Sequence, residues 1–398
     1  MYPKGSDPKV TLKEELMTLD DLENVTEHGM FDWGMMCHVV DEMGKDYYMD
    51  VGLSHIQAAA TFGGMPFGDT GMDMWNLSCR TGEGKVYTPR GTIYKVADFD
   101  GVTDAAWHPF PGGSLQYDVD EENERATVTL GEFTLEIDVK NGHTWHAVTY
   151  DEGQDIRVDF TSYGEGAPLW YSKDKVGTLV DHLKAIGYNW PTRLEGTLTI
   201  KGVEHKVHGM ASRERVILPD MANVEAGGYL DLIMVHFDEL QTALHDYKLS
   251  GHHDCELYLK AEDKYFATQD PRAKHDEVLN FDVHHEDWAY VRAIGVFVPT
   301  TFEVRVEVED GVLGYMAKAC GCKCVALQPD AEADVPNITL DTKIVEGTFT
   351  YNDGRVMELH NGFFINNIVI WRGYPSMLPN FGPATSFVEV NPSKSFEG

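Results

Sequence analysis

The stretch from Tyr188 to Phe237 holds the residues best suited to acid–base chemistry. Glu214 stands between Arg213 and Arg215, at the end of a segment whose residue pattern predicts a β-strand. A carboxyl group in an aromatic pocket has a raised pKa and can act as a general acid, with the two arginines pointing outward or fixing its orientation. A carboxylate locked by either arginine instead stays ionised and only orients other groups. Both interpretations are open from the sequence.

Other side chains of this stretch could share the same cavity. Asp231 is the second candidate catalytic carboxylate, and His208 shares a strand face with Glu214 if that strand stays regular. Aromatic and polar residues complete the predicted ligand-binding set: Trp75, Tyr163, Tyr171, Tyr188, Trp190, Arg213, Tyr229 and His236.

Two strands must position these groups. Leu194, Leu198 and Ile200 alternate with polar residues, which is the period of a half-buried strand. The pair Lys201-Gly202 predicts a tight turn, and the alternation resumes at Val203. We therefore expect a β-hairpin whose second strand carries the charged cluster.

The order of motifs in this hairpin resembles that of a known family. An extended Tyr-x-x-Pro at Tyr188 is followed by Gly-x-Leu-x-Ile-x-Gly and then by Gly209, Ala211, Arg213, Glu214 and Arg215. This resembles the two-domain lipocalin-like proteins of the AttH and carotenoid-hydratase type. The chain departs from the family pattern at the next step, where Val216-Ile217-Leu218 replaces Ser-Trp-Gly.

The resemblance implies a function as well as a fold. Relatives of this type include hydratases of isoprenoid or isoflavonoid alkenes and fungal cyclases of polyenes. We therefore expect a cofactor-independent lyase or isomerase that acts on a small hydrophobic molecule inside an apolar barrel, which excludes bulk water. A non-catalytic carrier of a lipid or terpenoid is the alternative. A third hypothesis, a carbohydrate-active β-sandwich, requires two opposed carboxylates in an open cleft.

The rest of the chain predicts an all-β protein with few short helices. Strand-like runs separated by short turns continue from Phe31 onward, which is typical of antiparallel barrels or sandwiches. We expect two lipocalin-like domains packed together, residues 1–250 and 251–398. Short helices are predicted near Leu12–Leu22 and over Val176–Ala185, with a turn or short helix at Asp238–His245.

The Gly- and Met-rich segment Ala58–Gly84 is longer than a hairpin loop needs. Its aromatic content, with Trp75 among the aromatic residues, suggests a lid over an apolar opening. A packed Ω-loop that closes a barrel end explains the same composition.

Composition excludes several classes of function. The formal net charge of −33 argues against nucleic acid and anionic membranes as partners, and no apolar run is long enough to span a bilayer. The N-terminus shows no secretory signal, so we expect a cytoplasmic protein, and a homodimer is possible.

The sequence offers no complete set of metal ligands. The alternating cysteines Cys320, Cys322 and Cys324 lack a fourth ligand, and we expect the histidines at 252–253 and 284–285 to lie in polar turns. We expect neither metal nor cofactor.

Overall fold

The computed structural model of the 398-residue chain describes most of its length. The described residues are 10–57, 61–62, 65–66, 71–81, 86–87, 94–96, 99–104, 107–171, 176–180, 183–220, 229–247, 252–267, 278–285, 288–291, 296–325 and 337–370. Helix among them is confined to α1 (Leu12–Leu16) and two single 3-10 turns, η1 (Leu19–Asp21) and η3 (Lys260–Glu262). The predicted all-β class is confirmed.

The first sheet has fourteen strands, all paired antiparallel. Its main path is, in spatial order, β10 (Gln116–Asp120), β11 (Arg125–Leu130), β12 (Phe133–Asp138), β13 (Thr144–Asp151), β14 (Ile156–Gly164), β17 (Leu183–Ile200), β18 (Val203–Leu218), β1 (Met30–Asp41), β2 (Asp46–Ile56), β5 (Met72–Thr81) and β6 (Val86–Tyr87). Off this path, β15 (Leu169–Trp170) and β16 (Val176–Val180) pair with β17, and β9 (Trp107–Pro111) pairs with β5.

The second sheet has twelve strands. Its main path is β22 (Lys264–Ala267), β21 (His252–Leu259), β20 (Leu240–Tyr247), β19 (Tyr229–His236), β30 (Phe363–Ile370), β28 (Asn337–Tyr351), β27 (Gly311–Val325), β26 (Thr301–Val308) and β23 (Val278–His285). Three more strands attach to it: β29 (Val356–Glu358), β7 (Tyr94–Val96) and β8 (Phe99–Asp104), the last running parallel to β27. Two separate hairpins are β24 (Trp288–Val291) with β25 (Val296–Pro299) and β3 (Thr61–Phe62) with β4 (Met65–Pro66).

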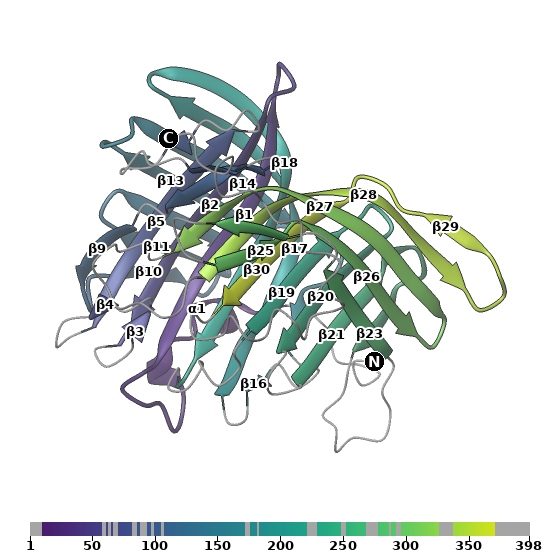
Figure 1. The fold of residues 1–398 in the computed structure, drawn as a ribbon. Coiled ribbons are helices and arrows are strands. Elements are labelled where there is room, and N and C mark those ends of the chain that lie inside the picture. The colour runs from purple at the N-terminus through teal and green to yellow at the C-terminus, as the bar shows by residue number, and fades with distance from the viewer. Residues whose placement is uncertain are drawn as a thin grey trace.

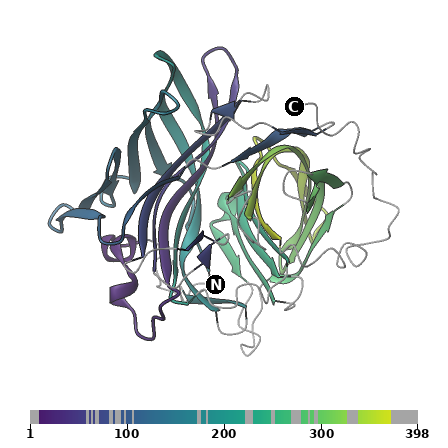
Figure 2. The same cartoon turned by 60° about the vertical axis from the view of Figure 1, so that its left-hand side comes forward.

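Both sheets curl, and they lie side by side (Figures 1 and 2). Figure 2 shows the second sheet (green to yellow, on the right) rolled into a ring, while the first sheet forms a curved layer to its left. In each sheet, every second residue of a strand points to the inside of the curled sheet. We call the inside of the first sheet the first lumen and the inside of the second sheet the second lumen. Trp33, Phe160 and Leu198 belong to the first lumen, and Phe302 and Leu313 to the second.

A third apolar cluster lies between the sheets. It combines Met30, Met36 and Val216 of the first sheet with Met234 and Phe363 of the second. The backs of β1 and β18 are therefore buried as well as their fronts, so polar side chains on either face of these strands sit inside the protein.

The predicted hairpin is present and forms the spine of the first sheet. β17 and β18 are 18 and 16 residues long, and Lys201 and Gly202 both have positive φ, at 50° and 74°. Two such residues match the twist of the flanking strands, which is why a Gly-containing pair fits this turn. The hairpin carries the charged cluster between β17 and β1.

Two local predictions are wrong. In the predicted helix Val176–Ala185, residues 176–180 form β16 and residues 183–185 begin β17, and β20 begins at Leu240 within the segment predicted as turn or helix. Apolar residues spaced three and four apart suit a helix locally, but pairing with neighbouring strands decides the conformation. The predicted helix near residues 12–22 is confirmed as α1 and η1.

The chain changes sheet between Leu218 and Tyr229, since β19 and β20 both belong to the second sheet. This favours a domain boundary there over one near residue 250, and the division into two domains stays a prediction. No helix in the described residues is long and apolar enough to cross a membrane.

Candidate functional site: a carboxyl pair between the sheets

Asp32 and Glu214 lie on the same face of two adjacent strands, β1 and β18. In the ladder Asp32 stands opposite Val216, and Gly34 stands opposite Glu214, so the two carboxyl residues are diagonal neighbours. Diagonal residues of this kind are about 7–8 Å apart. Both side chains are only partly buried, although both face the space between the sheets. Both carboxyl side chains therefore keep part of their surface accessible.

Burial changes the acidity of both groups. Loss of hydration raises the pKa of Asp32 well above its usual range, and the charge of Glu214 raises it further. Burial also raises the pKa of Glu214, while a hydrogen bond from Tyr171 partly opposes this. The Tyr171 hydroxyl donates to Glu214 Oε1 over 2.9 Å. The hydrogen bond favours the ionised form of Glu214, so Asp32 is the carboxyl that keeps its proton to higher pH.

Two further features of this face leave capacity for a ligand. Asn189 of β17 stands directly opposite Glu214 and is fully buried. Its amide oxygen and nitrogen make no hydrogen bond of standard geometry among the described residues, although the amide lies close enough to the Tyr171 hydroxyl to oppose part of the rise in the pKa of Tyr171. A buried amide in this condition is costly unless it binds something polar. On the β1 side, Gly34 contributes no side chain next to Glu214; an added Cβ would lie 3.8 Å from that of Glu214.

The surroundings are apolar and rich in methionine. Met36, Met210 and Met234 contribute to the cluster between the sheets, and the Ser212 hydroxyl contacts the sulfur of Met234 at 2.9 Å. His245 of β20 packs its ring against Tyr171, with centroids 5.0 Å apart. The site thus contains groups from both sheets.

The orientation predicted for the charged cluster is wrong for the arginines. Glu214 faces the second sheet, whereas Arg213 and Arg215 point into the first lumen and are fully buried there. They do not pair with Glu214, because neighbouring residues of a regular strand point to opposite sides. They do not reach solvent either, because the first lumen is packed around them. Arg213 lies between Trp145 and Trp190, at 5.0 and 5.2 Å from the ring centroids.

The other predicted site residues are dispersed. Tyr171 joins Glu214, while Tyr188 and Trp190 lie with Arg213 at the first lumen. Asp231 is in the second lumen, 3.0 Å from His285 Nε2. His236 is buried near Gln241 and Lys260, and burial and the charge of Lys260 lower its pKa to about 3.

Three of the predicted site residues, His208, Tyr163 and Trp75, lie away from Glu214. His208 is exposed and six residues along β18 from Glu214, about 20 Å at the usual rise of a strand. Tyr163 lies near the surface and donates to Glu195. Trp75 is buried in the first lumen, where it stacks on His108 at 3.6 Å. The side chain of Tyr229 lies outside the described residues.

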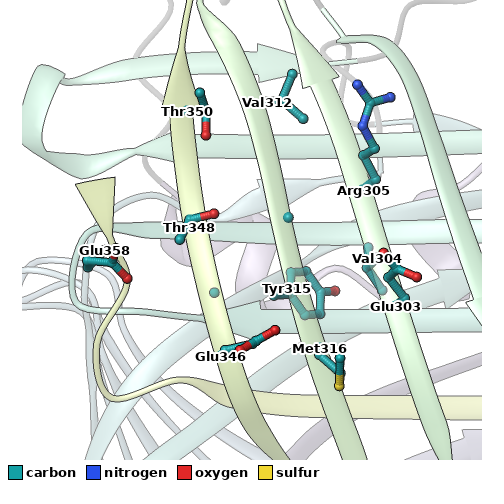
Figure 3. Close-up of a pocket in the computed structure, with 12 residues that line it drawn as sticks. Glu303, Val304, Arg305, Val312, Tyr315, Met316, Glu346, Thr348, Thr350 and Glu358 are labelled. Atoms are coloured by element: carbon teal, nitrogen blue, oxygen red, sulfur yellow. The ribbon is translucent and has the colours of Figure 1, made fainter. Parts of the chain in front are cut away.

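Two of the hollows in the described part of the chain differ in the chemistry of their lining. One, of about 420 Å³, lies over β26, β27 and β28 and is lined by Glu303, Arg305, Glu346 and Thr348 among others (Figure 3). Its charged lining does not suit an apolar ligand. The other, of about 220 Å³, lies beside the first lumen and is lined mainly by apolar groups, including Met17, Trp170 and Ile217.

Metal ligands do not cluster in the described residues: no three His, Cys, Asp or Glu side chains could hold an ion together there. The side chains of Cys320, Cys322 and Cys324 lie outside what is described. The absence of a cofactor stays a prediction.

Sequence reasoning missed Asp32, Asn189 and His245. Asp32 carries a weak signal, an acidic residue between Phe31 and Trp33 within an apolar strand. Asn189 stands in the same way between Tyr188 and Trp190. Neither signal shows that β1 and β17 both flank β18, which is a property of the sheet order.

Comparisons with solved structures support the fold. A protein assigned as AttH from Nitrosomonas europaea matches with a TM-score of 0.58 and 12% identity, over 94% of this chain and 99% of that one. Kievitone hydratase from Nectria haematococca matches with a TM-score of 0.50 and 9% identity, over 92% and 93%. No family model and no curated protein sequence matches the chain.

Proposed function

We propose that this chain is a cofactor-independent enzyme of the hydratase or isomerase type, acting on a small hydrophobic alkene. Its lipocalin-like all-β fold is one that a hydratase also has, which supports this proposal. The observation that carries this proposal is the pair Asp32 and Glu214, two carboxyl groups with raised pKa on one face of an apolar interior.

The pair can divide the acid and base roles. Asp32, which keeps its proton, donates it to one carbon of the double bond, and the more substituted carbon becomes a cation. A water molecule held at the amide of Asn189 adds to that cation. Glu214, whose ionised form the Tyr171 hydroxyl stabilises, takes the proton that the water loses. The net change is addition of one water, and proton transfer from Glu214 to Asp32 restores the pair.

The same groups account for isomerisation or cyclisation. If no water is bound at Asn189, Glu214 removes a proton from a carbon next to the cation, which moves the double bond or ends a ring closure. The apolar cluster of Met36, Met210 and Met234 excludes bulk water that would otherwise trap the cation.

Turnover by variants provides the test. The protein is incubated with a panel of prenylated phenols and polyenes in ¹⁸O-labelled water, and labelled alcohols are measured by mass spectrometry. Asp32→Asn and Glu214→Gln keep the shapes of the side chains and remove the ionisable groups. Each should lower turnover by about two to four orders of magnitude, the usual contribution of general acid–base catalysis. Glu195→Gln, at an exposed glutamate of β17, is the matched control and should retain full turnover.

A second variant tests where the substrate lies. Gly34→Val fills the open position beside Glu214, where an added Cβ makes only ordinary contact. It should abolish turnover while the melting temperature changes little. Full turnover in Gly34→Val, or in both carboxyl variants, would exclude this face as the site.

The carrier hypothesis keeps one specific support, the apolar cavity of about 220 Å³ beside Trp170 and Tyr188. It lies on the opposite side of β18 from Glu214, because Arg215 and Ile217 line it. A ligand bound there would not contact the carboxyl pair.

A further inference from the structure

The carboxylate of Glu15 occupies a polar site inside the first lumen. Glu15 belongs to α1 and is fully buried. Its Oε1 accepts hydrogen bonds from Tyr188 Oη (2.5 Å) and Trp145 Nε1 (3.3 Å), and His143 Nε2 lies 2.5 Å away. Burial alone would raise the pKa of Glu15, but His143, Tyr188 and Arg213 together outweigh it and hold the pKa below its usual value. The carboxylate is therefore ionised.

The site offers more donors than Glu15 uses. Nε and Nη1 of Arg213, and Oε2 of Glu15, are buried and have no hydrogen-bond partner among the described residues. The guanidinium of Arg213 is held between two indole rings, and its Nη2 donates to the His143 and Ser162 carbonyls. A buried cation with two unsatisfied donors, which is costly in isolation, suits an anion larger or better placed than the Glu15 side chain.

Backbone contacts hold the segment that carries Glu15. Trp33 Nε1 and Arg215 Nε both donate to the Glu15 carbonyl at 3.0 Å, and Arg215 also bonds the Met17 carbonyl. The apolar cavity adjoins this arrangement directly. Tyr188 and Arg215, which bond Glu15, also line the cavity together with Met17, Trp170 and Ile217. An anion site and an apolar cavity thus share a wall.

We propose that the first lumen is a binding site for a small aryl or alkyl monocarboxylate, and that Glu15 of the chain's own N-terminal segment occupies its carboxylate position in this structure. The ligand carboxylate would take the place of the Glu15 carboxylate against Arg213, His143 and Tyr188. Its apolar body would enter the cavity, whose volume of about 220 Å³ exceeds the ~150 Å³ that holds a benzene ring.

This site is distinct from the proposed catalytic pair. Arg213 and Glu214 point to opposite faces of β18, so a carboxylate bound in the first lumen does not contact Asp32 or Glu214. The proposal therefore stands or falls independently of the hydratase function.

Chemical rescue tests the proposal. Glu15→Ala removes a group of the size of acetate and should lower the melting temperature. Adding 3-phenylpropionate should restore it with a saturable dependence on concentration, whereas the neutral isostere 3-phenylpropionamide should bind at least about tenfold more weakly, because charge-assisted hydrogen bonds are lost. If Glu15→Ala does not fold alone, its refolding yield with each compound is measured instead. Glu23→Ala, at an exposed glutamate of the same segment, should show no rescue.

Two further measurements complete the test. The double variant with Glu15→Ala and Arg213→Met should lose the preference for the carboxylate over the amide. In the wild-type protein, 3-phenylpropionate must compete with the Glu15 side chain for Tyr188 and His143, so it should bind more weakly than it binds to Glu15→Ala. Equal rescue by acid and amide, absence of rescue by both, or a preference that survives Arg213→Met would each overturn the proposal and leave Glu15 a structural ion-pair member.

Discussion

Arg213 and Glu214 are neighbours in sequence, yet their side chains lie in two separate interiors of the protein. Arg213 is stacked between Trp145 and Trp190 in the first lumen, and Glu214 accepts a hydrogen bond from Tyr171 between the sheets. A strand buried on both faces makes this possible, since alternate residues enter different environments. One strand, β18, thereby supports two unrelated polar sites.

The stacked position of Arg213 should tolerate no substitution by lysine. A lysine keeps the charge but cannot lie flat between two indoles or donate in a fixed fork. Because the hydrogen bonds from Arg213 Nη2 to the His143 and Ser162 carbonyls are then lost, we expect Arg213→Lys to lower the free energy of unfolding by about 2–4 kcal/mol. Urea denaturation measures this. Arg193→Lys is the control, since Arg193 is exposed over the ring of Tyr163, and it should change little.

A close backbone approach fixes the glycine of the charged strand. A Cβ added at Gly209 would lie 2.1 Å from the carbonyl oxygen of His38 on β1, and that backbone cannot move without breaking the ladder. We expect Gly209→Ala to lower the melting temperature severely, by a loss of about 3 kcal/mol or more. A Cβ added at Gly314 would have no other atom within 4 Å, so Gly314→Ala should be tolerated. Similar melting temperatures for the two variants would contradict this reasoning.

The hairpin could be predicted from the sequence, whereas the pairing of Asp32 with Glu214 could not. Alternation in β17 and β18 and the pair Lys201-Gly202 predicted the hairpin, because strand period and turn chemistry are local. The partnership of Asp32 with Glu214 spans 182 positions and depends on β1 lying beside β18. Likewise the burial of both faces of β18 depends on the second sheet, which no pattern within the strand reports.

Trp75 illustrates the same limit. The composition of its segment suggests a lid or a packed loop, but Met72–Thr81 is the strand β5 and Trp75 is buried against His108 and Phe133. Trp75→Ala should therefore destabilise by about 3–5 kcal/mol, the range for truncating a buried aromatic residue. Thermal and urea unfolding measure it. Near-native stability together with weakened ligand binding would restore the lid hypothesis.

The pH dependence of stability should report the proton on Asp32. An aspartate in the unfolded chain titrates near 3.9. In the folded protein burial and the charge of Glu214 raise the pKa of Asp32 well above that value. Between the two pKa values the folded state binds more protons than the unfolded state, so this group's contribution is fully present below about pH 4 and is lost as the pH rises. Compared with Asp32→Asn, the wild-type protein should therefore lose stability as the pH rises above about 4. A difference between the two proteins that does not depend on pH would show that Asp32 titrates normally.

Tyr171 should act on the reaction through Glu214. Its hydroxyl donates to Glu214, which opposes the effect of burial and lowers the pKa of that carboxyl. Tyr171→Phe removes only this hydroxyl, so the pKa of Glu214 should rise. Because Glu214 must be ionised to accept a proton from water, the acidic limb of the pH–rate profile should move to higher pH. The alkaline limb, set by loss of the Asp32 proton, should move less. The profile of kcat/KM for wild type and Tyr171→Phe measures both limbs. If Tyr171 served packing alone, the variant would change the melting temperature and leave both limbs in place.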